Sequence, residues 1–253
     1  MRERTQHRIC VSIGRRDILS AVEAAKGIAS LADVLEIRLD FLDNPSIPAF
    51  LSALHCPLLF TNRPTWEGGH YTGPEEERIE LLAEAIVGGA AYVDLELQSP
   101  PTSLHRLRSE SAGSATRLIL SRHDFSGTPD REELVAWLQA MGEGGADIGK
   151  IVTTAHDHHD VLRVLHLQEE AAAMDLPLIA FCMGQPGMIS RLATLELGGY
   201  MTYCAVDVKE ATAPGQIAVT DLKRIYTLRR HGSPETSGII RDEGQDVPQR
   251  RKA

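Results

Sequence analysis

Lysine is scarce in this chain. The 253 residues include 26 basic ones, and only five of these are lysines: Lys26, Lys150, Lys209, Lys223 and Lys252. The 35 acidic residues outnumber the basic ones and give a net charge of −9. Because nucleic acids and anionic membranes are bound by basic surfaces, we expect neither a nucleic-acid nor a membrane partner. The rarity of lysine makes the position of each one informative.

Long apolar runs and paired cysteines are also absent. No stretch of about 18 apolar residues occurs, which argues against a membrane span. The first residues, MRERTQHR, lead into no apolar segment, so we expect no signal peptide. The cysteines lie far apart without a CxxC pair, which predicts reduced thiols in a cytoplasmic protein rather than disulfides or a zinc site. They are Cys10, Cys56, Cys182 and Cys204.

Hydrophobic residues make up 43% of the chain, enough for a sizeable core, and they recur in short apolar runs that alternate with stretches of helical periodicity. The predicted strands are Ile9–Ile13, Val34–Leu39, Pro57–Thr61, Tyr92–Leu97, Arg117–Ser121, Ile148–Thr153, Pro177–Cys182 and Met201–Val206. The predicted helices are Asp17–Ser30, Ile47–Leu54, Pro74–Val87, Pro101–Ser109, Pro129–Met141, Asp157–Met174, Gly187–Leu197 and Gln216–Arg229.

Strands that alternate with helices in this way favour parallel pairing through right-handed crossovers. The units follow one another without a linker, and a closed barrel of this kind typically takes ~250 residues. A doubly wound open sheet is the alternative, but it usually carries a glycine-rich phosphate-binding turn, which is missing after the first strand. We therefore predict an α/β fold with a single (β/α)8 TIM barrel over residues 1–230 and a polar, disordered C-terminal tail over residues 231–253.

Charged residues mark the carboxyl ends of the predicted strands, where the active sites of barrels are built. The second strand ends in Glu36-Ile37-Arg38-Leu39-Asp40, and its alternation places the charges on one face and the aliphatic residues on the other. If the aliphatic residues pack on the helices, the charges enter the barrel mouth. Further polar groups at strand ends are Arg63, Asp94, Glu96 and His123.

Lys150 lies inside the sixth predicted strand, between Ile148 and Val152. Lysine is rarely buried, because burying its charge costs several kcal/mol unless the charge is paired or neutralised. A lysine amine attacks a carbonyl only when it is unprotonated. Burial beside cations such as Arg63 or Arg191 would favour that form. Lys150 is therefore a candidate nucleophile.

The neighbours of Lys150 fit this chemistry. His123 is the natural proton carrier beside it. Asp94 and Glu96 would hold the amine protonated if they came close, so we expect them to pair with arginines instead. The predicted mouth also holds a cluster of guanidinium groups, which bind carboxylates well and indicate an anionic substrate: Arg38, Arg63 and Arg191. The pattern predicts a Schiff-base enzyme for a small anionic carbonyl compound, with aldolase, dehydratase and transaldolase all open.

At these residues the sequence resembles the type I 3-dehydroquinate dehydratases of the shikimate pathway, over essentially the whole barrel. The matching segments are Ile9–Ser12, Glu36–Asp40, Arg63 with Glu67–Gly69, Asp94–Glu96, Ser121–Phe125, Gly145–Ile151, Met183-Gly184, Gly187 with Ser190-Arg191, and Ala213–Gln216. The resemblance implies a hydro-lyase, without metal or cofactor, that converts the small molecule 3-dehydroquinate to 3-dehydroshikimate. This is the third step of chorismate and aromatic amino-acid biosynthesis. Members of the family are often monomers or homodimers.

The resemblance also implies roles for single residues. Lys150 would form an imine with the C3 carbonyl. His123 would remove a C2 proton and then protonate the departing C1 hydroxyl in a syn elimination. Arg191 would bind the substrate carboxylate. The other implied substrate contacts are Ser12, Glu36, Arg38, Arg63, Thr212 and Gln216, with Asp94, Glu96 and Met183 in support.

Some positions depart from the commoner family pattern. Phe181 stands where methionine is frequent, Tyr203 where phenylalanine is, and Thr212 where serine is usual. Two rival functions are a class I aldolase, whose phosphate site the loop Gly184–Gly187 could imitate, and a barrel that binds a sugar acid without catalysis. Either function is compatible with the same barrel fold.

Two further features have plainer interpretations. The run His156–His159 looks like a metal cluster, but its spacing matches no zinc pattern, and Asp157 suits the start of a helix. We therefore expect no metal there. Trp66 either rims the active site or only packs against its neighbours.

Overall fold

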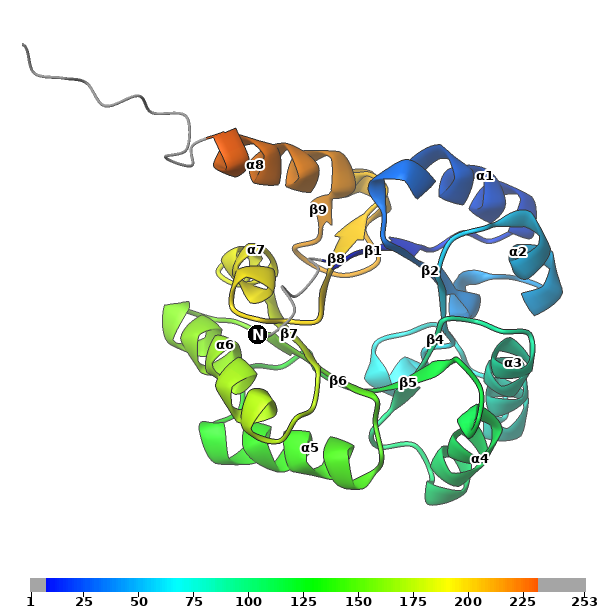
Figure 1. Cartoon of the computed structure of the whole chain (residues 1–253), viewed down its shortest axis with the longest axis horizontal. Coiled ribbons are helices and arrows are strands. Elements are labelled where there is room, and N and C mark those ends of the chain that lie inside the picture. Colours follow the sequence, from blue (N-terminus) through cyan, green and yellow to red (C-terminus); the bar gives the residue numbers. More distant parts are fainter. Residues whose placement is uncertain (1–7, 232–253) are drawn as a thin grey trace, which may run out of the picture.

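The computed structural model describes residues 8–231, whose parallel strands form a ring surrounded by helices (Figure 1). The strands are β1 (Arg8–Ile13), β2 (Val34–Arg38), β3 (Leu58–Thr61), β4 (Tyr92–Glu96), β5 (Arg117–Asp124), β6 (Ile148–Thr154), β7 (Leu178–Met183), β8 (Met201–Ala205) and β9 (Ile217–Ala218). The α-helices are α1 (Ile18–Ile28), α2 (Ile47–Ala53), α3 (Glu75–Val87), α4 (Pro101–Ser111), α5 (Arg131–Glu143), α6 (His158–Ala173), α7 (Met188–Glu196) and α8 (Val219–His231). The short 3-10 helices are η1 (Ala29–Leu31), η2 (Leu39–Phe41), η3 (Thr65–Glu67) and η4 (Val208–Glu210).

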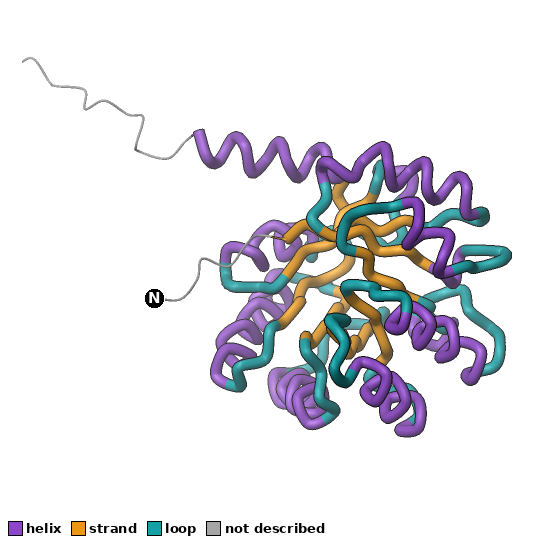
Figure 2. The backbone as a smooth tube through the Cα atoms, turned by 45° about the vertical axis from the view of Figure 1, so that its right-hand side comes forward, coloured by secondary structure: helices purple, strands orange, loops and turns teal. Residues whose placement is uncertain are grey.

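The sheet closes into a barrel, which confirms the predicted fold class. Its strands are parallel and hydrogen-bonded in the order β7-β6-β5-β4-β3-β2-β1-β8-β9. Between β7 and β8 the backbone N–H of Tyr200 donates to the carbonyl oxygen of Leu178 at 2.8 Å. The helices cover the outside of the strands (Figure 2).

The alternation of side chains along the strands separates two cores. Outward residues such as Val11, Ile37 and Ile151 pack with the helices, where the larger hydrophobic cluster lies. Inward residues at the amino-terminal side are apolar, as Cys10 and Ile148 show, and they form a second, smaller cluster inside the barrel. Further along several strands the inward positions become polar, as Ser12, Glu36 and Lys150 show, so the carboxyl-terminal mouth collects charged residues.

The last barrel unit differs from its prediction. The final helix was expected from Gln216, but α8 begins at Val219, because Ile217 and Ala218 pair with Cys204 and Ala205 of β8 as the short strand β9. Strand β5 also runs to Asp124, beyond its predicted end. This extension carries His123 on a strand rather than on a loop.

Among residues 8–231 no helix is long and apolar enough to cross a membrane. The four cysteines are free thiols. Of the predicted tail, only His231 falls within the described residues, where it ends α8, and residues 232–253 lie outside them.

Candidate active site

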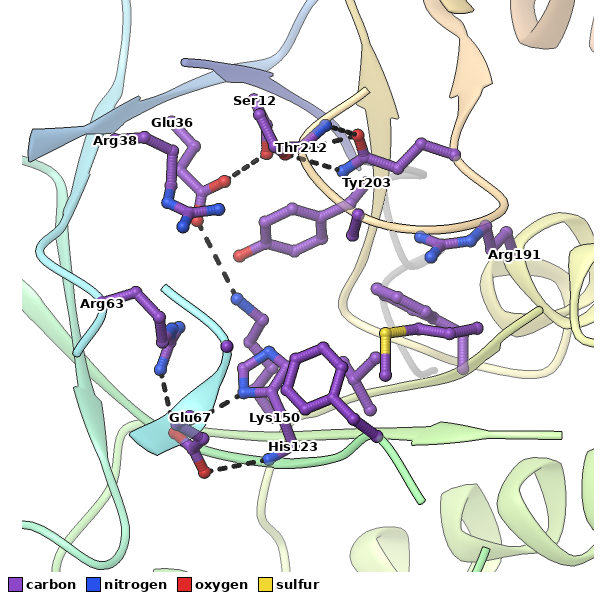
Figure 3. Close-up of a pocket in the computed structure, with 17 residues that line it drawn as sticks. Ser12, Glu36, Arg38, Arg63, Glu67, His123, Lys150, Arg191, Tyr203 and Thr212 are labelled. Carbon is purple, nitrogen blue, oxygen red and sulfur yellow. Dashed lines mark hydrogen bonds and ion pairs between the residues drawn. The ribbon is translucent and has the colours of Figure 1, made fainter. Parts of the chain in front are cut away.

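A pocket opens at the carboxyl-terminal ends of the barrel strands (Figure 3). Its lining brings together residues from distant parts of the sequence. They are Ser12, Glu36, Arg38, Arg63, Glu67, Gly68, His123, Phe125, Lys150, Val152, Phe181, Met183, Arg191, Tyr203, Thr212, Ala213 and Gln216. Of the predicted site residues, only Asp94 and Glu96 are outside this lining. Both contact the lining through Arg63.

Lys150 points from β6 into the centre of this pocket (Figure 3). The residue is 4% exposed, and its neighbours Ile148 and Val152 belong to the cluster inside the barrel, as the alternation predicts. Its Nζ lies 2.9 Å from Oδ2 of Asp94 and 3.9 Å from Oε1 of Glu36. The expectation that Asp94 avoids the lysine is therefore wrong. In β4 the carboxylate faces inward at the same level, and a buried ammonium needs such a partner.

The carboxylate of Glu36 is held by its own hydrogen bonds. The hydroxyl of Ser12 donates to Oε2, and that of Thr61 donates to Oε1 at 2.8 Å. Both donors come from strands adjacent to β2, in β1 and β3. Glu36 is thus fixed in place beside Lys150 before any ligand enters.

Arg63 links the carboxylates beneath the pocket. Its Nη2 lies 2.8 Å from Oδ1 of Asp94, and its Nη1 lies 2.7 Å from Oε1 of Glu96. Burial alone would raise the pKa of Asp94, but Arg63 and Lys150 more than offset this and hold the pKa well below its usual range. The predicted pairing of Asp94 and Glu96 with an arginine is therefore confirmed. Asp94 serves the lysine and the arginine together.

The sequence interpretation missed two ionic residues of this network. Glu67 of η3 contacts both Arg63 and His123, and Arg78 of α3 is fully buried against Glu96. Neither lies on a strand, so strand periodicity could not point to them. Glu67 does belong to a segment that carries the family resemblance, and this was the available signal.

His123 stands beside Lys150 at the end of β5. Its backbone N–H donates to Oε1 of Glu67 at 3.0 Å, and its Nδ1 lies 3.6 Å from Oε2 of the same carboxylate. Burial, with Arg63 and Lys150 nearby, lowers the pKa of His123 well below its usual value. The imidazole is therefore neutral at pH 7 and can accept a proton.

Arg191 of α7 is a buried guanidinium without a carboxylate partner among the described residues. Its Nη2 donates to the carbonyl oxygen of Pro214 at 3.1 Å, while Nε and Nη1 are buried and lack any partner in residues 8–231. Burial lowers the pKa of Arg191 to about 10, so the group stays charged at pH 7. A buried, charged fork with free donors is a receptor for a carboxylate.

The segment between β8 and β9 covers part of the mouth. Thr212 and Gln216 bond each other there, with the backbone N–H of Thr212 donating to Oε1 of Gln216 at 2.8 Å. The segment packs closely on the turn after β1, where Gly14 leaves no room for a side chain. A Cβ atom on Gly14 would lie 3.0 Å from Cγ2 of Thr212 and nearer still to the Phe41 ring. Both predicted residues thus reach the pocket from this lid segment.

The other residues considered in the sequence lie outside the pocket lining. Trp66 is about half exposed and does not line the pocket. Asp157 caps α6, as predicted, by accepting from the N–H groups of His159 and Asp160. His156 bonds the carbonyl oxygen of Ser126, and no group of three or more possible metal ligands forms within residues 8–231.

Fold and site together define the class: a (β/α)8 barrel enzyme with a buried lysine at the centre of its mouth. Residues 9–233 match the family model of the type I 3-dehydroquinases. A 3-dehydroquinate dehydratase of Desulfotalea psychrophila is 50% identical over 219 residues, 87% of this chain and 96% of that protein. The chain belongs to the type I 3-dehydroquinase family.

Solved structures agree with this assignment. The crystal structure of a 3-dehydroquinate dehydratase from Geobacillus kaustophilus has a TM-score of 0.82 at 30% identity, over 90% of this chain and 93% of that one. A type I enzyme from Clostridium difficile, solved with covalently modified comenic acid, has a TM-score of 0.80 at 29% identity, over 90% and 95% of the two chains.

Proposed function

We propose that this chain dehydrates 3-dehydroquinate to 3-dehydroshikimate through an imine on Lys150. The observation that carries the proposal is the convergence of Lys150, His123 and Arg191 on one pocket. They supply a nucleophile, a neutral base and an unpaired anion receptor. These are the three groups that elimination next to a carbonyl in a carboxylate substrate requires.

Arg191 binds the carboxylate at C1 of the substrate. Its Nε and Nη1 have no hydrogen-bond partner in residues 8–231, and either one together with the second hydrogen of Nη2 can form a two-point contact with a carboxylate. The stacking of its guanidinium 4.5 Å over the Phe181 ring fixes the plane of the fork. One end of the substrate is thereby anchored away from Lys150.

Lys150 then forms the covalent intermediate. The ammonium first gives one proton to the neutral His123, and the amine so formed attacks the C3 carbonyl carbon. His123 then returns the proton to the carbinolamine oxygen, which leaves as water, so that an iminium cation remains on Nζ and His123 is neutral again. Asp94 and Glu36, at 2.9 and 3.9 Å from Nζ, balance the charge of this cation. The carboxylates that hold the ammonium in the free enzyme therefore stabilise the iminium as well.

His123 moves the proton. The neutral imidazole removes a proton from C2, and the electron pair flows into the iminium to give an enamine. The imidazolium then returns the proton to the C1 hydroxyl, which leaves as water from the same face, and the electron pair of the enamine forms the new double bond. Hydrolysis of the imine by water releases the product and restores Lys150.

The remaining lining residues position the ring. Glu36, Arg38 and Arg63 face the edge that carries the substrate hydroxyls, and Ser12 holds Glu36 in place. In the lid segment, Thr212 and Gln216 close over the substrate, and Met183 adds an apolar wall. We propose further that the enzyme works in the cytoplasm, as a monomer or homodimer, in aromatic amino-acid biosynthesis.

The proposal is tested by product formation in two lysine variants. Wild-type protein should convert 3-dehydroquinate to a product with the ultraviolet absorbance of a conjugated enone. Lys150→Ala should lose this activity, whereas Lys26→Ala, at an exposed position on α1, should keep it. Full activity in Lys150→Ala would overturn the mechanism. Carbon–carbon cleavage in place of dehydration would favour the aldolase alternative.

A further inference from the structure

The hydroxyl of Tyr203 is a polar group that the mechanism above does not use. Tyr203 lies in β8 and is 4% exposed, and its side chain lines the pocket. Its hydroxyl oxygen is buried and has no hydrogen-bond partner among residues 8–231. The ring itself has a function, because Nζ of Lys150 lies 4.3 Å above its centroid.

The other tyrosines differ in this respect. The hydroxyls of Tyr92 and Tyr200 bond each other at 2.9 Å, and those of Tyr71 and Tyr226 donate to backbone carbonyl oxygens at 2.8 and 3.1 Å. All four groups are satisfied within the protein. The unpaired hydroxyl of Tyr203 is therefore an exception in this chain, and it sits in the substrate pocket.

An unpaired buried hydroxyl is costly, so a partner should appear when the pocket fills. Burial raises the pKa of the Tyr203 phenol well above its usual value, and the group remains an O–H donor at any working pH. Phenylalanine would fill the same space without this cost. The hydroxyl thus has a use only if something in the pocket accepts its hydrogen.

The direction of the hydroxyl indicates which atom that is. Figure 3 shows it pointing toward the side of the pocket that holds Glu36 and Arg63, and away from Arg191. On the proposed function, the substrate carboxylate lies at Arg191, C3 at Lys150, and C2 toward His123. The other neighbour of C3, C4 with its hydroxyl, must then face the side toward which Tyr203 points.

We propose that the hydroxyl of Tyr203 donates a hydrogen bond to the C4 hydroxyl oxygen of the bound substrate. The contact makes Tyr203 a specificity-determining residue for a hydroxyl next to the reacting carbonyl. It also fixes the rotation of the ring about the Lys150 imine, so that the C2 proton faces His123. This inference rests on the proposed function.

The test compares Tyr203→Phe with wild type on two substrates, 3-dehydroquinate and its analogue without the C4 hydroxyl. On 3-dehydroquinate the variant should lose about tenfold in kcat/KM, the typical effect of one neutral hydrogen bond. On the 4-deoxy analogue the two proteins should be equal, because the acceptor is gone. Tyr226→Phe, outside the pocket, should match wild type on both substrates.

Two kinetic results would overturn the inference: an equal loss on both substrates, which indicates a structural role, or no loss on 3-dehydroquinate. A thermal unfolding midpoint of free Tyr203→Phe at or above that of wild type supports the inference, because the variant lacks the unpaired hydroxyl. A clearly lower midpoint contradicts it. If wild type dehydrates neither substrate, the proposed function fails, and this outcome is distinct from all the others.

Discussion

Arg15 and Glu210 form an ion pair between the loops that follow the adjacent strands β1 and β8, with Nη2 of Arg15 2.5 Å from Oε2 of Glu210. Arg15 follows β1, and Glu210 ends η4 in the segment that leads to Thr212 and Gln216. The pair joins residues 195 positions apart in the sequence. It therefore ties the lid segment to the turn after β1, the strand that pairs with β8.

The first prediction concerns this tie. Arg15→Ala should raise KM for 3-dehydroquinate a few-fold and make little difference to unfolding, because pairs this exposed contribute about 0–1 kcal/mol to stability. The control is Arg16→Ala, in the same turn as Arg15. It breaks the more exposed ion pair between Arg16 and Asp43 and should leave KM unchanged. The charge swap of Arg15→Glu with Glu210→Arg should restore KM. A wild-type KM in Arg15→Ala would exclude a role for the ion pair in lid closure.

The second prediction is a pH profile. Since the pKa of His123 is lowered by burial and by neighbouring cations, its neutral form persists well below pH 6.5, the usual histidine value. Activity should fall only once protonation sets in, so the acid limb of kcat/KM should lie below pH 6.5. The measurement is kcat/KM from pH 4.5 to 8 in one buffer system of constant ionic strength. An acid limb at or above pH 6.5 would contradict the assigned environment of His123.

The third prediction concerns Arg191. Replacing it with methionine removes a buried charge that has no anion in the free protein, so stability should not fall, whereas KM should rise about 10- to 100-fold through the lost charged hydrogen bonds. Steady-state kinetics and thermal unfolding of the same preparation check both parts. Added guanidinium should recover part of the loss. A large loss of stability with unchanged KM would assign Arg191 a structural role instead.

The fourth prediction links Asp94 to acid stability. The folded pKa of Asp94 is held below its unfolded value of about 3.9, so its contribution to stability is present above that value and is lost as the pH falls through the lowered folded pKa. At pH 7, Asp94→Asn leaves the charges of Lys150 and Arg63 short of a partner and should cost about 3–5 kcal/mol. The difference should shrink in urea unfolding below pH 4. A constant difference from pH 7 to pH 3 would contradict this account.

Strand periodicity predicted the centre of the site well. Lys150 is flanked by Ile148 and Val152 at inward positions, and the alternation in β2 placed Glu36 and Arg38 at the mouth, whereas Asp40 lies in η2 outside the pocket lining. Such predictions succeed because a strand carries side chains on two fixed faces. Both predictions need only the order of residues within one strand.

The missed features depend on tertiary contacts. Glu67 reaches His123 from a 3-10 turn, which has no repeating pattern. Asp94 of β4 approaches Lys150 of β6 over the intervening strand β5, a distance set by the register and curvature of the sheet rather than by either strand alone. Tyr203 stands out in the sequence only as a departure from the usual phenylalanine, and its unpaired hydroxyl is visible only in the structure. Sequence order specifies which face a residue occupies, whereas packing decides which partner it meets.

The most direct test of the central claim is to trap the imine. Wild-type protein is incubated with 3-dehydroquinate, sodium borohydride is added during turnover, and the digested protein is analysed by mass spectrometry. The account predicts irreversible inactivation with a substrate-derived mass on Lys150, and His123→Ala should still form some of this adduct while turning over very poorly. Dehydration that proceeds without any modification of Lys150 would contradict it.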